Sequence, residues 1–470
     1  MAAPAISKRP FGFWSSVQEA IRGTEQDFTE GSISRAVLLL ATPMVLEMLM
    51  ESLFAIVNVF WVTRLGADAI ATVGLTESMM TIVFAVGIGV SMSTTAMVAR
   101  RIGEKDHRGA ATAGVQAILI GVVVSLIMGI PAFLLAPRLL GFMGASPELV
   151  ASGQNYTAIV LGANIVVLLL FLNNAIFRGA GDAAIAMRVL WGANLVNLVL
   201  DPCLIFGLGP FPEMGITGAA ISTLVGRGCG VAYQLWALMN GRSRVSVKRS
   251  DLRVVPKVLA TLVRVSGAGV MQFAVANVSW LVLVRFISSF GSIAVAGYTI
   301  GIRIFIFAIL PSWGLSGAAA TMVGQNLGSK KPERAVKAVY LTGAFNSIYL
   351  GAVSLVFIFA PEILVGLFSH DGQVTQYAVD CLRIIGFGNL AYAFGMVMIQ
   401  AFNGAGDTWT PMVVNMIGFW LCEIPLAWAL AFPGGLGVRG VFYAIPIAHA
   451  LITVMGLTMF VRGSWKERRV

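Results

Sequence analysis

The sequence predicts an all-α integral membrane protein in which twelve transmembrane helices form two six-helix bundles related as parallel repeats. Of the 470 residues, 57% are hydrophobic and only 11% are charged, whereas charged residues make up about a quarter of a soluble domain. The charges cluster in short runs between apolar blocks, each long enough to cross a bilayer core of about 30 Å. In addition, FRGAGDAAIAM at 177–187 returns as FNGAGDTWTPM at 402–412.

Twelve apolar blocks are the candidate spans, and several exceed the length that a membrane requires, which predicts tilting or extension beyond the bilayer. Prolines inside the blocks, Pro43 among them, predict kinks at places where neighbouring groups satisfy the freed carbonyls. The candidate spans lie at 34–62, 72–99, 110–136, 152–176, 184–207, 216–239, 258–287, 293–324, 335–360, 375–402, 410–431 and 438–461.

The duplicated stretch extends over the whole chain. Its two copies are 225 positions apart, and the same offset aligns RLGADAIA (64–71) with SFGSIAVA (289–296) and MVARRIGEK (97–105) with MVGQNLGSK (322–330). One offset that serves several separated stretches indicates internal duplication. Because six spans per half is an even number, both halves enter the membrane from the same side, which predicts a pseudo-twofold axis along the membrane normal.

The domain prediction follows from this repeat. We expect a cytoplasmic N-terminal segment with an amphipathic helix near 11–23, two lobes of six helices, a linker and a short tail. The N-terminal lobe covers 33–239 and the C-terminal lobe 257–462; the segment, linker and tail are 1–32, 240–256 and 463–470. The repeated GAGD turn predicts a helix hairpin in which Asp182 and Asp407 cap the following helix.

Basic residues set the orientation. They concentrate at 99–109, 241–253, 328–337 and 465–469, whereas the opposite loops at 207–215 and 432–440 are nearly free of them. The positive-inside rule then places both termini in the cytoplasm of a multi-pass protein of the cell's inner (plasma) membrane. This topology, with contact to anionic lipid, explains the net charge of +10, so no nucleic-acid partner is expected.

Several of these segments resemble the multidrug and toxic compound extrusion (MATE) transporters. The resemblance runs from about 33 to 461 and rests on LATP (40–43), RLGADAIATVGL (64–75), AMVARRIGEKD (96–106) and NLVNLVLDPCLIFG (194–207). It implies a V-shaped two-lobe transporter, not an enzyme, that exports diverse, often cationic organic compounds in exchange for H⁺ or Na⁺. A monomer with a small-molecule substrate and no cofactor is expected.

The resemblance also implies a cation site in the N-terminal lobe. An asparagine and an aspartate four residues apart in the fifth span match Asn197 and Asp201, and the hinge proline of the first span matches Pro43. Fifteen residues after this proline stands Asn58, where the family usually has aspartate. In the seventh span, where another branch has glutamate, stands Gln272.

The residues themselves indicate the same region. At 100° per residue, Glu47, Glu51 and Asn58 share one helical stripe, and Asn194, Asn197 and Asp201 share another. A carboxylate in hydrocarbon costs several kcal/mol unless it is paired or solvated. Carboxylate and amide oxygens are ligands for Na⁺ or acceptors for a relayed proton, so the two stripes predict one cation site, with Asp201 as its principal group. The alternative is that Asp201 pairs with a helix-end donor and the glutamates lie near an interface.

A substrate cleft between the lobes is expected to offer aromatic and apolar surface, although such residues also serve helix packing. Arg303 is expected to pair with Glu423 or to face this cleft. A rival function, a flippase for a lipid-linked or polyanionic substrate, would need a strongly cationic cavity, and Arg303 is the obvious intramembrane cation. The candidate cleft residues are Phe84, Met271, Gln272, Tyr298, Arg303, Phe305 and Trp313.

Overall fold

The computed structural model describes residues 13–23, 26–369 and 371–468, and it is built of helices. The N-terminal lobe contains α2 (Ile33–Thr63), α3 (Ala67–Gly103), α4 (His107–Leu134), α5 (Ala136–Phe142), α6 (Pro147–Gly162), α7 (Asn164–Ala180), α8 (Ala183–Phe206) and α9 (Gly215–Met239). The C-terminal lobe contains α10 (Pro256–Ser288), α11 (Ser292–Gly328), α12 (Pro332–Phe359), α13 (Pro361–Val365), α14 (Gly372–Ala405), α15 (Trp409–Asn415), a π-helical turn (Met416–Glu423), α16 (Ile424–Ala431) and α17 (Val438–Arg462). Two 3₁₀ turns lie at Arg249–Asp251 and Ser464–Glu467.

Eleven of the described helical segments are long and apolar enough to cross a membrane. Two of them combine shorter helices, because α6 continues into α7 and α15 continues through the π-helical turn into α16. The remaining candidate span is α9, which is less apolar than the others and packs along α8. The predicted all-α membrane fold with twelve spans is therefore confirmed.

The backbone repeats at the interval seen in the sequence. The helices α3 and α11 begin and end 225 residues apart, and so do α4 and α12. The two described non-glycine residues with positive φ, Lys105 (φ 63°) and Lys330 (φ 58°), are separated by the same interval. Since rare backbone conformations recur at equivalent positions, the two lobes are copies of one fold.

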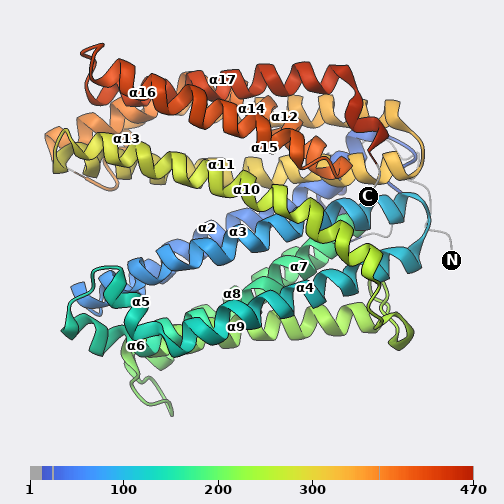
Figure 1. Ribbon diagram of the computed structural model, residues 1–470, viewed down its shortest axis with the longest axis horizontal. Helices are drawn as coiled ribbons and strands as arrows, with labels where there is room; N and C mark the ends of the chain where they lie inside the picture. Colours follow the sequence, from blue (N-terminus) through green and yellow to red (C-terminus); the bar gives the residue numbers. More distant parts are fainter. Residues whose placement is uncertain (1–12, 24–25, 370, 469–470) are drawn as a thin grey trace.

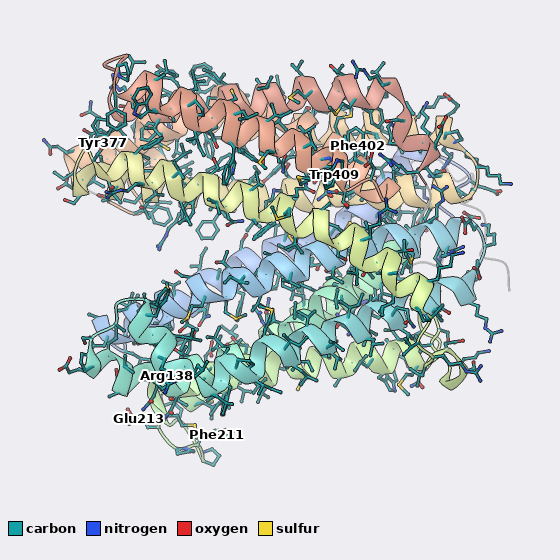
Figure 2. All side chains as sticks on the ribbon, in the orientation of Figure 1. Arg138, Phe211, Glu213, Tyr377, Phe402 and Trp409 are labelled. Atoms are coloured by element: carbon teal, nitrogen blue, oxygen red, sulfur yellow. The ribbon has the colours of Figure 1, made fainter. Side chains whose placement is uncertain are left out.

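The lobes form a V (Figure 1). They meet at the end of the molecule where both termini lie and diverge towards the end with α5, α6 and α13. The labelled side chains of Arg138 on α5 and Tyr377 on α14 mark the separated arms (Figure 2). The V is thus open at the end opposite the two termini.

The first helix of each repeat packs on both lobes. Residues of α2 from Ala36 to Met44 share a core with Ala318 and Met322 of α11. Correspondingly, Leu262 of α10, the first helix of the second repeat, lies in a core of the N-terminal lobe built mainly from α3, α4 and α7. The boundaries at 33 and 257 thus divide the sequence into its two repeats. In the structure, however, the first helix of each repeat also packs on the other lobe.

At the closed end of the V, glycines allow α3 and α11 to pack closely. A Cβ atom on Gly103 would lie 2.0 Å from the carbonyl oxygen of Gln325, and one on Gly328 would lie 2.2 Å from that of Arg100. The hydroxyl of Ser329 donates to the carbonyl oxygen of Gly103 over 2.9 Å. The helices α3 and α11 therefore cross with their backbones in contact, which a side chain at either glycine would prevent.

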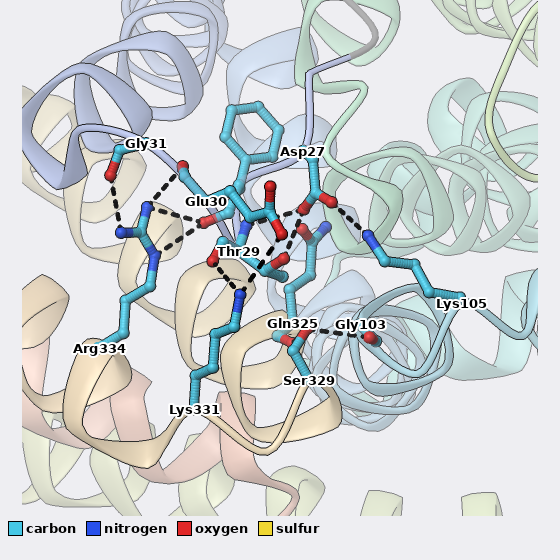
Figure 3. A network of polar contacts seen from close by, with 11 residues as sticks. Asp27, Thr29, Glu30, Gly31, Gly103, Lys105, Gln325, Ser329, Lys331 and Arg334 are labelled. Atoms are coloured by element: carbon cyan, nitrogen blue, oxygen red, sulfur yellow. Dashed lines mark hydrogen bonds and ion pairs between the residues drawn. The ribbon is translucent and has the colours of Figure 1, made fainter. Parts of the chain in front are cut away.

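Residues 26–31, which we call the strap, tie the two lobes together at this closed end (Figure 3). Asp27 forms an ion pair with Lys105 of the N-terminal lobe. On the other side, Lys331 Nζ donates to the carbonyl oxygen of Thr29 over 3.0 Å. Arg334 donates to the carbonyl oxygens of Gly31 and Glu30, each over 2.8 Å.

The charge of Asp27 is stabilised within the strap. Burial by itself would raise the pKa of the Asp27 carboxyl, but hydrogen bonds from Lys105 and Thr29 outweigh it and lower this pKa to about 2. The carboxylate is therefore ionised at neutral pH, as its ion pair with Lys105 requires.

Two local expectations change, and a third holds. The predicted amphipathic helix is α1 (Phe13–Arg22), which packs on α2 through Ala20 and a Glu19–Arg35 ion pair, while residues 11 and 12 lie outside the described residues. Asp407 accepts a capping hydrogen bond from the N–H of Thr410, but Asp182 instead accepts from Ser243 and Arg244 of the linker. The two aspartates of the repeated turn thus serve different contacts.

Candidate functional site

Asp201 lies on α8 and is 1% exposed. Its Oδ1 accepts a hydrogen bond from the hydroxyl of Ser222 on α9. Asn197, one turn earlier on α8, donates through Nδ2 to Ser222 Oγ over 3.1 Å and to Thr223 Oγ1 over 3.3 Å. The spacing of four residues therefore places Asn197 and Asp201 on one face of α8, against α9. We call these four residues the Asp201 cluster.

A glycine allows this close approach of α8 and α9. A Cβ atom on Gly226 would lie 2.8 Å from the carbonyl oxygen of Ala193 and 3.2 Å from Cβ of Asn197. Because α9 presents only a hydrogen atom at this point, the hydroxyls of Ser222 and Thr223 reach the side chains of α8.

The Asp201 cluster contains unused acceptors. Asp201 Oδ2 and Asn197 Oδ1 are buried, and neither has a hydrogen-bond partner in the described part of the chain. An unpaired buried carboxylate is costly, and oxygen atoms of this kind are acceptors for a proton or ligands for a hard cation. No group of three or more His, Cys, Asp or Glu residues suited to a metal ion occurs within 13–23, 26–369 and 371–468. The donor set, one carboxylate with neutral oxygens, therefore fits a proton or a monovalent cation.

Tyr156 links further ionisable residues to this cluster. Tyr156 of α6, 8% exposed, interacts electrostatically with Asp201, with Glu77 of α3 and with Arg227 of α9. Ser222, Thr223 and Tyr156 carry no distinctive pattern and could not be predicted from the sequence. Glu77 and Arg227 were not predicted either, although each is a charge inside a predicted span, the signal that indicates Asp201.

The glutamates of α2 contact other residues than Asp201. Glu47, 2% exposed, accepts a hydrogen bond of 3.1 Å from Asn174 of α7. Glu51 forms an ion pair of 3.6 Å with Arg227. The polar stripe of α2 therefore faces α7 and α9, whereas the stripe of α8 faces α9. No described hydrogen bond or ion pair joins either glutamate to the Asp201 cluster.

The other predicted members of the site are less connected. Asn58 is half-buried, and the described chain offers it no hydrogen bond to Asp201 or Asn197. Asn194 is 5% exposed, and its Nδ2 has no hydrogen-bond partner among the described residues. Pro43 lies inside a continuous α2. The next residue, Met44, packs closely on α11, because a Cβ atom added to Gly314 would lie 2.5 Å from the Met44 carbonyl oxygen. The proline thus sits where α2 touches the C-terminal lobe.

The predicted cleft residues divide into two groups. Met271, Trp313 and Arg303 are exposed. The cleft assignment of Tyr298 is corrected, because its ring is 1% exposed and stacks on Phe442 in the core of the C-terminal lobe. Gln272 is likewise buried, whereas Phe84 and Phe305 are half-buried, so their cleft assignment stays a prediction. Gln272 is 5% exposed, Phe84 packs against Phe171, and Phe305 packs against the lobe core.

Of the two alternatives expected for Arg303, pairing with Glu423 is not found among the described contacts, which leaves the cleft-facing position. Glu423 accepts a hydrogen bond of 2.7 Å from Ser279. Arg303 of α11 instead interacts electrostatically with Glu77 of α3, and both side chains are exposed. Arg303 therefore faces the N-terminal lobe. It is also not alone as an intramembrane cation, because Arg227 lies inside the sixth span.

The sequence matches a known protein family in both repeats. The family model described as MatE matches residues 43–203 and 269–429, one match in each repeat. This chain belongs to the MatE family. It is a multi-pass membrane protein of a transporter family, as the two matched repeats and the apolar helices together indicate.

Relatives of this MatE protein align over nearly their whole length. A probable multidrug resistance protein NorM from Thermotoga maritima is 24% identical over 438 residues, covering 93% of this chain and 94% of the relative. An FAD transporter from Shewanella oneidensis is 24% identical and covers 90% of this chain and 93% of the relative. The outward-facing conformation of a multidrug resistance MATE family transporter has a TM-score of 0.87 at 24% identity, covering 94% and 98% of the two chains. The structural likeness shows that the fold is shared.

Proposed function

We propose that this MatE protein is a secondary active antiporter that exports diverse, often cationic organic compounds in exchange for H⁺ or Na⁺. It works by alternating access in the plasma membrane, with both termini in the cytoplasm. The observation that carries the proposal is the Asp201 cluster, in which a buried carboxylate keeps one oxygen without a partner inside one lobe of a two-lobed chain. The multidrug resistance names of relatives support the substrate class.

The residues suggest how a cation could drive the cycle. A proton or Na⁺ on Asp201 neutralises a charge buried between α8 and α9, so its binding favours the arrangement of the lobe in which the carboxylate is enclosed. The cation can drive transport only as far as its affinity differs between the two arrangements. Because α2 contacts both α8 and α11, a bend at Pro43 would transmit a change in the N-terminal lobe to the contact between the lobes.

The second candidate is transport of a lipid-linked or polyanionic compound. Arg227 and Arg303 favour it, since both are cations within predicted spans, and one relative is named as a transporter of FAD. Glu51 pairs with Arg227 and Glu77 interacts with Arg303, so each cation has an acidic neighbour. Cationic organic compounds therefore remain the first proposal.

Transport into inverted membrane vesicles separates these possibilities. Uptake of a fluorescent organic cation is measured while a pH gradient and a Na⁺ gradient are imposed one at a time. The proposal expects uptake that depends on one of the two gradients. Uptake that ignores both gradients would contradict antiport, and uptake of an FAD-like anion in place of the cation would favour the second candidate.

A further inference from the structure

Beside the Asp201 cluster, the N-terminal lobe contains a second set of buried polar side chains. Glu47 of α2 accepts a hydrogen bond from Asn174 of α7 over 3.1 Å, and Asn174 accepts one from Gln234 of α9 over 2.6 Å. Glu47 is 2% exposed, Asn174 5% and Gln234 0%. We call these three residues, which come from three different helices, the Glu47 cluster.

The Glu47 cluster also holds unused acceptors. Glu47 Oε2 and Gln234 Oε1 are buried without a hydrogen-bond partner in the described chain. Asn173, next to Asn174 on α7, is 0% exposed, and its Oδ1 and Nδ2 likewise make no described hydrogen bond. A buried carboxylate with one hydrogen-bond donor and a neighbouring unpaired amide oxygen also occurs in the Asp201 cluster, where the donor is the Ser222 hydroxyl.

No ion pair with a described residue neutralises Glu47. The ionisable groups that act on it are Arg178, one turn along α7 from Asn174, and Glu51, one turn along α2. Glu51 is itself paired with Arg227 of α9. From α8, the neighbouring contact is neutral, a hydrogen bond from Trp191 to the carbonyl oxygen of Leu46. Because an uncompensated carboxylate in hydrocarbon costs several kcal/mol, Glu47 requires a proton or a bound cation.

The two clusters are too far apart for one ion. Ser222 and Gln234 are twelve residues apart on α9, which corresponds to about 18 Å along the helix axis. The Glu51–Arg227 pair lies between them along α9. Since α9 ends at Met239 and leads into the linker, the Glu47 cluster lies on the side of the lobe towards the termini (Figure 1).

We propose that Glu47, with Asn174 and Gln234, forms a second acceptor site for a monovalent cation, separate from Asp201 and nearer the cytoplasm. The inference rests on the proposed function, which supplies a coupling cation. A cation released from Asp201 would then meet an acceptor within the same lobe before it reaches the cytoplasm.

Counting bound cations tests the inference without measuring transport. The full-length protein in lipid nanodiscs is examined by equilibrium binding of ²²Na⁺ and by the number of protons taken up between alkaline and mildly acidic pH. We expect Glu47→Gln to lose one equivalent per chain in one of the two measurements, Asp201→Asn to lose one, and the double variant to lose two. The matched control is Glu213→Gln on the exposed loop between α8 and α9, which should bind Na⁺ like the wild type (Figure 2).

The outcomes are distinguishable. If Glu47→Gln matches Glu213→Gln in both measurements, or if Asp201→Asn alone removes every equivalent, Glu47 is not a separate site. That result leaves the proposed function intact, because the function depends on Asp201. Thermal unfolding of each variant, together with retention of the Asp201 equivalent in Glu47→Gln, shows that a lost equivalent does not reflect misfolding.

Discussion

At the scale of single residues, the proposed cation site depends on contacts between helices. The spacing of Asn197 and Asp201 placed both on one face of α8, and this could be predicted from the sequence. The hydroxyl of Ser222 could not be predicted, because its contact with Asp201 depends on the register of α9 against α8, which Gly226 permits. Asn58 lies on the predicted stripe of α2, and no described hydrogen bond joins it to Asp201.

The Ser222 hydroxyl is expected to tune the affinity of the site. Ser222→Ala removes a donor to a charged acceptor, an interaction of about 1.5–3 kcal/mol. We expect a change of about tenfold or more in the cation concentration that gives half-maximal transport. The control is Ser78→Ala on the exposed surface of α3, and equal values for the two variants would show that Ser222 does not act on the site.

The Asp27–Lys105 pair gives a pH prediction. The pKa of Asp27 is lowered to about 2, so the stabilisation it provides is complete above the unfolded-state pKa of about 4 and is lost as the pH falls towards 2. The difference in thermal stability between wild type and Asp27→Asn should stay constant from neutral pH to about pH 5 and shrink below about pH 4. A difference that shrinks already between pH 7 and 5 would contradict this account.

At the scale of elements, the apolar blocks predicted the helices well but not their interruptions. The block at 152–176 is broken between α6 and α7, where Asn164 bonds back to the carbonyl oxygen of Leu161. The block at 410–431 contains the π-helical turn Met416–Glu423. Both irregularities depend on tertiary packing, and neither changes the hydrophobic pattern. Several helices, such as α3, also extend beyond the apolar block that predicted them.

The crossing of α3 and α11 should be sensitive to one methyl group. A Cβ atom on Gly103 would meet the backbone of Gln325 at 2.0 Å, so Gly103→Ala should destabilise the protein by about 1–3 kcal/mol. Gly74→Ala on the same helix is the control, because a Cβ atom there meets nothing within 4 Å. Thermal unfolding in detergent measures both variants, and equal melting temperatures would exclude a close crossing.

At the scale of the whole molecule, duplication explains why the fold was predictable, while the proposed cation site lies in one lobe only. One offset of 225 residues relates α3 to α11 and α4 to α12. The same offset places Leu426 opposite Asp201, so the C-terminal lobe has no carboxylate at the equivalent position. The exchange of α2 and α10 between the lobes was not predictable, because hydrophobic patterns do not say which bundle a helix contacts.

The strap is expected to hold the lobes together at the closed end of the V, which the proposed orientation places on the cytoplasmic side. Replacing both Lys331 and Arg334 with Ala removes its bonds to the C-terminal lobe and should increase the fraction of molecules open to the cytoplasm by about tenfold, for a loss of about 1.4 kcal/mol. Spin labels at the exposed positions His107 and Glu333 measure the separation of the lobes at this end.

The exposed Lys337 of α12 provides the control, since Lys337→Ala removes a charge from the same helix without touching the strap. We expect a second, longer distance in the double variant alone. A distance distribution identical to that of the wild type would mean that the strap does not restrain the lobes.

The most direct test of the central claim compares two kinds of transport by Asp201→Asn in proteoliposomes. This change keeps the shape of the side chain and removes its charge, so gradient-driven export should be lost, while expression and exchange of labelled for unlabelled substrate without a gradient should remain. Loss of both activities with normal folding would assign Asp201 to substrate binding. Full gradient-driven export by Asp201→Asn would contradict the account, because the buried carboxylate could not then be the group that couples the cation to transport.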